Sequence, residues 1–394
     1  MAAADKVAEK PGGIQEFFRS ADRWLFGFGS PVTLGLFRMV FCAIVLITLA
    51  LGLPNFTEFY TEEGLFTADM AQRMRGDWIR FSIMEWSLSP AWGLAVYLFT
   101  MLLAFLGMIG LWTRPVIIAL AVLVVSVQYR NLMILHSGDT LMRILLIFLA
   151  LAPCGAAVSL DRVLGLWKGK KPPEPATVSL WPQRLIQLQI ALVYFTTVWH
   201  KWPGATWRDG TAVWYPLNLR EFERFPLPAW AESGIIIPVG TYGTLLVELA
   251  LATLVWYKPW RNYVLLAGVG MHLFIEYRLN IPMFSAIIVA AYICFYDGEE
   301  VSRGAKRLGN LLARFKAKLL GQWIPEKMTA LKALDPFDFL TYETTSAEEP
   351  DQSRLFSTRS VGYWPLIWVP GLSRKLLRSA QVSPTEVNAE STPR

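Results

Sequence analysis

Four side chains that can take part in proton transfer lie within or beside apolar stretches of this chain: His136, His200, Lys201 and His272. Ionisable groups are costly in a lipid environment, so those that occur there are functional candidates by default. A lysine that is removed from water gives up its proton more readily and can act as a base, and histidines can support it. These residue types predict a site that abstracts protons.

Each of these residues also has a structural interpretation. Lys201 could extend toward lipid headgroups beside interfacial tryptophans. His136 could belong to a turn in which Asp139 caps the following helix. His272 precedes Glu276 by one helical turn, so the two side chains could hydrogen-bond to each other. The residues alone leave both interpretations open.

Further residues could complete such a site. Glu248 sits in an apolar run and could either pair with a basic group between helices or relay protons. His200 directly precedes Lys201, and because successive helix residues point about 100° apart, the two cannot face one spot equally. Trp199 and Trp202 flank this pair and suit either an interfacial belt or the wall of a pocket.

Metal binding is the main alternative chemistry. His136 and His272 could be axial ligands on neighbouring helices, since neutral imidazole suits iron. However, there is no second such pair and no CxxCH motif. The three cysteines, Cys42, Cys154 and Cys294, lack CxxC spacing and give neither a metal knuckle nor a disulfide framework. We therefore predict no metal.

The composition indicates the environment of these residues. Of 394 residues, 54% are hydrophobic and only 17% are charged, whereas soluble domains carry roughly 25% charged residues. This argues against a soluble enzyme, a disulfide-rich secreted scaffold and a disordered protein. The excess of 37 Lys and Arg over 31 Asp and Glu is too small to favour a nucleic-acid-binding protein, so we predict a lipid bilayer and no nucleic acid as partner.

The apolar stretches predict an all-α, polytopic membrane protein with about eight transmembrane helices. The expected spans are 32–53, 91–112, 115–135, 140–158, 184–200, 234–257, 262–277 and 281–296. An interfacial segment (1–31) precedes this transmembrane domain (32–297), with an amphipathic stretch from Ile14 to Phe28. A basic polar tail (298–394) follows it and begins with a second amphipathic helix.

Loop charges predict the orientation. The connections expected on the inner side carry basic residues such as Arg114, Lys168, Lys170, Lys171 and Lys258, while those on the outer side are longer and richer in acids. Because cytoplasmic loops are enriched in Lys and Arg, we expect both termini and both amphipathic extensions to be cytoplasmic. The three histidines and Lys201 then lie toward the outer ends of the helices.

Several strings of residues, in order along the chain, resemble one known family. They include Leu36–Arg38, Glu63–Leu65, Asn131–Asp139, Val158–Asp161, Arg184–Lys201, Trp207–Gly210 and Met271–Ser285. Together they are similar to the transmembrane portion of the vitamin K-dependent γ-carboxylases, which is shared with bacterial HTTM (horizontally transferred transmembrane domain) proteins. The resemblance covers roughly residues 30 to 297.

The resemblance implies roles for individual residues. Lys201 matches the proposed base that deprotonates vitamin K hydroquinone, His136 matches a histidine that assists it, and His272 would lie near the quinone or the glutamate. The implied reaction oxidises a reduced vitamin K of the menaquinol type to its epoxide with O₂. This oxidation drives proton abstraction from glutamate, to which CO₂ then adds. A Glu-containing peptide or protein is the implied substrate. We also expect His200, Trp199, Trp202, Glu248, Glu276 and Asn131 near the site.

Two departures from the animal enzymes remain. Those enzymes carry a large lumenal portion that docks the substrate's propeptide, and a lysine where this chain has His200. The shorter architecture implies a bacterial inner membrane, with the active site toward the periplasm. The alternative is an HTTM protein without carboxylase activity that handles lipids or small molecules or binds a partner. A transporter would favour half-helices broken at corresponding positions, and the sequence has no such internal symmetry.

Overall fold

The structure, a computed structural model, describes residues 13–76, 80–167, 177–228 and 234–319. These residues are mostly helical, and the only paired strands among them are the two-residue β1 (Phe28–Gly29) and β2 (Val178–Ser179). The all-α fold class predicted from the sequence is confirmed. The predicted tail beyond residue 319 lies outside the described residues.

A helix occupies each of the eight apolar stretches. These helices are α2 (Val32–Gly52), α5 (Pro90–Ile109), α6 (Thr113–Arg130), α7 (Ser137–Leu151), α9 (Trp181–Lys201), α12 (Ile236–Thr253), α13 (Lys258–Arg278) and α14 (Phe284–Ala291), the last continued by the 3₁₀ turn η6 (Tyr292–Phe295). Among the described residues, four helical regions are long and apolar enough to cross a membrane, namely Val32–Tyr60, Pro90–Ile109, Thr113–Arg130 and Ile236–Trp256. The chain is therefore an all-helical polytopic membrane protein, and the count of eight spans stays a prediction.

Shorter elements connect and flank these helices. On the side predicted to be cytoplasmic lie α1 (Gly13–Phe26), α8 (Leu160–Trp167), η5 (Leu254–Trp256) and α15 (Gly298–Leu319). On the opposite side lie η1 (Leu53–Asn55), α3 (Phe56–Tyr60), α4 (Ala68–Arg75), η2 (Ile83–Trp86), α10 (Ala205–Arg208), α11 (Trp214–Leu217) and η3 (Arg220–Phe222). In α1, Ile14, Phe17 and Phe18 are exposed, as expected for an amphipathic helix on a membrane surface.

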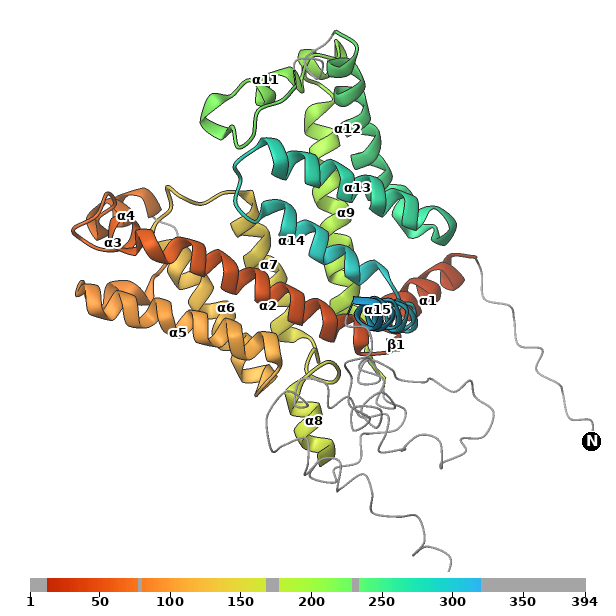
Figure 1. The fold of residues 1–394 in the computed structure, drawn as a ribbon, viewed down its shortest axis with the longest axis horizontal. Coiled ribbons are helices and arrows are strands. Elements are labelled where there is room, and N and C mark those ends of the chain that lie inside the picture. Colours follow the sequence, from red (N-terminus) through yellow and green to blue (C-terminus); the bar gives the residue numbers. More distant parts are fainter. Residues whose placement is uncertain (1–12, 77–79, 168–176, 229–233, 320–394) are drawn as a thin grey trace, which may run out of the picture.

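Two groups of helices meet at α14. In the first group α2 packs along α5, α5 along α6 and α6 along α7. In the second, α9 packs along α12, and α12 contacts α13. α14 contacts α2, α7, α9 and α13 and lies between the two groups (Figure 1). The core is accordingly built from apolar side chains of both groups, such as Phe41, Leu145, Ile186 and Ile288.

Buried polar contacts join the helices on the side predicted to be cytoplasmic. The fully buried Arg38 of α2 donates hydrogen bonds to the carbonyl oxygens of Gly107, at 3.0 Å, and Val158. The carboxylate of Asp161 accepts hydrogen bonds from the backbone N–H groups of Trp112 and Thr113, both at 2.7 Å. Two of the strings that carried the family resemblance, at 36–38 and 158–161, thus hold α2 and α5 to the start of α6.

Candidate functional site

Lys201 forms an ion pair between two helices at the end of α9. Its Nζ lies 2.5 Å from Oε1 of Glu248 on α12, and the hydroxyl of Thr197 donates to the other carboxylate oxygen at 3.3 Å. The side chain of Glu248 is only 9% exposed and that of Lys201 24%. Of the two roles open to Glu248 from the sequence, pairing with a basic group between helices is therefore seen directly.

An aromatic ring also lies against Lys201. The Nζ atom lies 4.8 Å from the ring centroid of Trp207 in α10. A cation over an indole face is attracted by the ring quadrupole, and more strongly so where water is excluded. The lysine ammonium therefore contacts both a carboxylate and an indole ring, and both are provided by segments that follow α9 in the chain.

A second polar cluster lies deeper along the same face of α9. Tyr194 precedes Lys201 by seven residues, about two helical turns. Its hydroxyl lies 2.8 Å from Nε2 of His272 on α13 and 2.5 Å from the hydroxyl of Tyr292 in η6. Thr197, whose hydroxyl contacts Glu248, lies one turn from Tyr194 and also contacts the backbone carbonyl of Tyr194 at 2.8 Å. The ion pair and this tyrosine–histidine cluster therefore form one polar region inside the helical bundle.

Three buried polar atoms beside this region have no hydrogen-bond partner among the described residues. They are Nδ1 of His272, Oε2 of Glu276 and the hydroxyl oxygen of Ser285 in the first turn of α14. Buried polar groups are nearly always hydrogen-bonded in native proteins. The histidine nitrogen and the serine hydroxyl are therefore available to a polar group of a bound molecule.

Glu276 does not hydrogen-bond to His272 in the structure. Its Oε1 instead pairs with Nη1 of Arg224 at 2.6 Å, while His272 turns its Nε2 to Tyr194. The simple pairing within α13 that the sequence allowed is therefore replaced by two contacts to other segments. Arg224 lies in the connection from α9 to α12, whose described residues 202–228 we call the outer segment.

His136 belongs to the turn that caps α7, as one of its two sequence interpretations expected, but the N-cap residue is His136 itself and Asp139 completes the capping box. Its Nδ1 accepts a hydrogen bond from the backbone N–H of Gly138 at 3.0 Å, and Asp139 accepts one from the backbone N–H of His136 at 2.9 Å. Phe284 lies between this turn and His272. A Cβ added to Gly138 would lie 3.4 Å from Cα of Phe284, and the ring of His272 lies 5.9 Å from that of Phe284.

The other residues expected near the site lie elsewhere on the surface or in the outer connections. Trp199 and Trp202 are 68% and 63% exposed, and His200 is exposed as well. Trp199 stacks on Phe195 of its own helix. Asn131 is buried and donates its side-chain N–H to the carbonyl of Phe59 at 2.9 Å. Of the expected set, the structure pairs Lys201 with Glu248 and links His272 to the same helix through Tyr194.

An outer segment is fastened to α13 by arginines. The buried Arg278 donates hydrogen bonds to the carbonyl oxygens of Leu217 and Phe225, and its guanidinium also pairs with Glu223 at 2.5 Å. The segment that leads from Trp207 over Lys201 is therefore held against the end of α13. Within the described ranges, no group of three or more His, Cys, Asp or Glu is placed to hold a metal ion.

Sequence reasoning missed three members of the polar region, namely Tyr194, Thr197 and Tyr292. Tyr194, Thr197 and Lys201 occur at helical spacing and thus share one face of α9, so this signal was readable. Tyr292 gave no such signal, because its hydroxyl reaches Tyr194 only through the crossing of α14 and η6 over α9. Gly268 permits this approach, because a Cβ there would lie 2.6 Å from the Tyr292 hydroxyl.

Comparison with known proteins identifies the family. An HTTM domain model matches residues 30–299, more than half of the chain. The uncharacterized protein YitO of Bacillus subtilis is 31% identical over 120 residues, which cover 28% of this chain and 38% of that protein. No solved structure matches. The match of the HTTM model over these residues, together with the helical architecture, shows that the chain belongs to the HTTM domain family.

Proposed function

We propose that this protein is a membrane-embedded enzyme of the vitamin K-dependent γ-glutamyl carboxylase type. It would couple oxidation of a menaquinol-type hydroquinone to proton abstraction from glutamate and carboxylation of the resulting carbanion. The single observation that carries the proposal is the ion pair of Lys201 and Glu248 at 2.5 Å, formed two turns along α9 from the Tyr194 that contacts His272, inside a helical membrane protein. Membership of the HTTM family supports it.

The ion pair provides a route to a neutral amine. Transfer of one proton from Nζ of Lys201 to Oε1 of Glu248 turns two charges into a neutral amine and a neutral carboxylic acid. A low-dielectric site favours the neutral forms, because it penalises isolated charges. Nζ can then accept the proton of a hydroxyl group bound beside it, and the restored ammonium stabilises the oxyanion that remains.

The residues around the pair fit a hydroquinone. Such a molecule has hydroxyl groups and an apolar ring, and the buried groups without a hydrogen-bond partner among the described residues include Nδ1 of His272 on α13 and the hydroxyl of Ser285 on α14. When bound, a reduced quinone supplies the electrons that reduce O₂. His272 would hold a hydroxyl group through Nδ1, while the hydrogen bond between the Tyr194 hydroxyl and Nε2 fixes its ring. Exclusion of water would protect a strong base and a carbanion.

The proposal places the reaction toward the periplasmic side of a bacterial inner membrane. Lys201 ends α9, and the segments that cover it, from Trp207 to Arg224, belong to the side where we expect the longer and more acidic connections. A Glu-containing peptide or protein would approach from this side, whereas the quinone would arrive through the bilayer. No nucleic acid is expected as a partner.

The experiment is a reconstituted carboxylation assay. The full chain in liposomes is supplied with menaquinol, O₂, bicarbonate and a Glu-containing peptide, and γ-carboxyglutamate and quinone epoxide are quantified by mass spectrometry. We expect both products from the native protein and neither from Lys201→Ala. Lys258→Ala is the matched control, because Lys258 is 69% exposed and pairs with Asp297 on the other side of the bundle. Full product formation by Lys201→Ala would refute the assignment of the base.

One observation favours a second candidate function, an HTTM protein without carboxylase activity. Lys201 is fully paired with Glu248 and covered by Trp207, and such an arrangement can also serve only to join α9 to α12. The protein would then handle a lipid or another small molecule, or bind a partner. This candidate predicts no oxygen consumption when reduced quinone and a Glu peptide are supplied together.

A further inference from the structure

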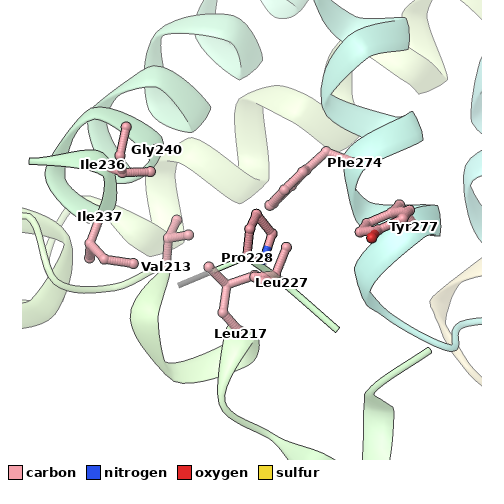
Figure 2. Close-up of a pocket in the computed structure, with 9 residues that line it drawn as sticks. All are labelled: Val213, Leu217, Leu227, Pro228, Ile236, Ile237, Gly240, Phe274 and Tyr277. Atoms are coloured by element: carbon pink, nitrogen blue, oxygen red, sulfur yellow. The ribbon is translucent and has the colours of Figure 1, made fainter. Parts of the chain in front are cut away.

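An apolar cavity lies between the outer ends of α12 and α13. Its volume is about 340 Å³, and its lining includes Val213 and Leu217 of the outer segment, Ile237 and Gly240 of α12, and Phe274 and Tyr277 of α13 (Figure 2). Small-molecule sites are mostly apolar clefts of about 300–1,000 Å³. The cavity therefore has the size and character of a site for a slender apolar group.

The surroundings of the cavity indicate where its occupant comes from. The neighbouring residues Val239 and Leu246 of α12 and Leu273 of α13 are 63%, 67% and 63% exposed. In a membrane protein, large apolar side chains exposed on adjoining helices face lipid. The cavity therefore adjoins a lipid-facing surface, which favours a chain dissolved in the bilayer over a peptide from water.

The cavity is connected to the ion pair through α12 and through the outer segment. Ile237, Thr241 and Glu248 recur at helical spacing and share one face of α12, and the eleven helical steps from Ile237 to Glu248 span about 16 Å. Thr241 accepts a hydrogen bond from the backbone N–H of Val213 at 3.2 Å. The outer segment thus lines the cavity at Val213 and covers Lys201 at Trp207.

The distribution of polar groups selects one kind of occupant. The described lining carries no charged side chain, and the hydroxyl of Tyr277 already donates to the carbonyl of Pro226 at 3.1 Å. A phospholipid would need polar or charged side chains at the cavity to bind its headgroup. A prenylated quinol instead needs polar groups at its ring, which the pair of Lys201 and Glu248 provides farther along α12, and only apolar contacts along its chain.

We propose that this cavity binds the isoprenoid chain of the quinol whose ring reacts beside Lys201. This inference rests on the proposed function for the identity of the ring, but the binding of the chain does not depend on turnover. The chain would enter sideways from the bilayer between α12 and α13. The cavity thereby selects prenylated quinols over quinols without a chain and over acyl lipids.

Two glycines of α12 provide a matched pair of variants. A Cβ added to Gly240 would meet the side chain of Val213 at 3.6 Å, inside the cavity, whereas one added to Gly243 has no atom within 4 Å. Replacing either glycine by leucine raises helix propensity equally. Gly240→Leu therefore fills the cavity, and Gly243→Leu controls for every other effect of the substitution.

The test is photolabelling of the full chain in liposomes, with the labelled peptides mapped by mass spectrometry. The probe is a geranylgeranyl-substituted naphthoquinone with a diazirine in its chain, reduced before use, and a palmitoyl phospholipid with the same diazirine forms the second arm. We expect the quinol probe to label residues 236–240 or 274–277. Gly240→Leu should lower this labelling on the order of tenfold, because the probe chain would lose the burial of about two methylene groups. Gly243→Leu should retain the labelling.

Each other outcome is decisive. Labelling of these residues that survives Gly240→Leu, or equal labelling by the phospholipid probe, would overturn the assignment of the cavity. The expected labelling without any carboxylation would uphold the cavity and refute the proposed function. Carboxylation without labelling at these residues would uphold the function and refute the cavity.

Discussion

Lys201 at the end of α9 and Glu248 within α12 form a salt bridge between two helices, with Nζ and Oε1 2.5 Å apart. The lysine also lies at a helix C-terminus, where the helix dipole favours a positive charge. Because the carboxylate is buried, each partner depends on the other for compensation of its charge. The same pair can therefore stabilise the fold and exchange a proton between Nζ and Oε1. Mutations of the two residues can distinguish the effect on stability from the effect on activity.

Removing the carboxylate charge should destabilise the protein. We expect Glu248→Gln to lower the free energy of unfolding by about 1–3 kcal/mol, because it leaves the lysine charge without its buried partner. The measurement is thermal unfolding in detergent, with Lys201→Met added to complete a double-mutant cycle.

The control is the exposed pair of Lys258 and Asp297, whose side chains are 69% and 46% exposed. Exposed pairs contribute about 0–1 kcal/mol, so Asp297→Asn should have little effect. If Glu248→Gln proved no more costly than Asp297→Asn, the buried pair would not have the energetic role given to it.

Tyr194 should matter for activity through His272. Tyr194→Phe removes the hydroxyl that holds Nε2 of His272 at 2.8 Å and leaves the ring without a side-chain hydrogen bond among the described residues. Loss of one such hydrogen bond costs about 1 kcal/mol, so we expect the rate of product formation with quinol to fall about fivefold or more. Tyr263→Phe, at a residue that is 71% exposed, should leave it unchanged. Equal rates for both variants would argue against a role for this hydrogen bond.

Gly268 should be required by the tyrosine cluster. Gly268→Ala places a Cβ 2.6 Å from the hydroxyl of Tyr292 and 3.0 Å from Leu251, and such overpacking costs about 1–3 kcal/mol. Thermal unfolding in detergent measures this cost. Gly270→Ala is the control, because nothing lies within 4 Å of its added Cβ. Tyr292→Phe combined with Gly268→Ala should cost less than the two single changes together, and strict additivity would contradict the proposed clash.

The sequence predicted the helical fold and most of the ionisable residues of the site, but not their partners. The apolar stretches predicted the helices, and the ionisable residues within or beside these stretches predicted Lys201, Glu248 and His272 as candidates for the site. Sequence spacing shows only which residues share a face of one helix. The partners Lys201 and Glu248 are 47 positions apart, and Tyr194 and His272 are 78 apart. Such contacts depend on how α9, α12 and α13 cross, and for the same reason Glu276 pairs with Arg224 rather than with His272.

Arg278 should hold the outer segment in place. Its guanidinium contacts the carbonyl oxygens of Leu217 and Phe225 and the carboxylate of Glu223. Lysine lacks this forked geometry, so Arg278→Lys should increase amide hydrogen exchange in residues 217–225. Arg73→Lys is the control, since Arg73 is 79% exposed and pairs only with Asp69 on its own helix among the described contacts. Unchanged exchange in Arg278→Lys would mean that other contacts hold the segment.

Oxygen uptake by the reconstituted protein tests the central claim most directly, because it reports the first proton abstraction without requiring the right peptide. The full chain in liposomes receives menaquinol, and an oxygen electrode records consumption for the native protein and for Lys201→Met. The account predicts quinol-dependent uptake by the native protein and none above background by Lys201→Met. Equal uptake by both, or none by the native protein, would contradict it.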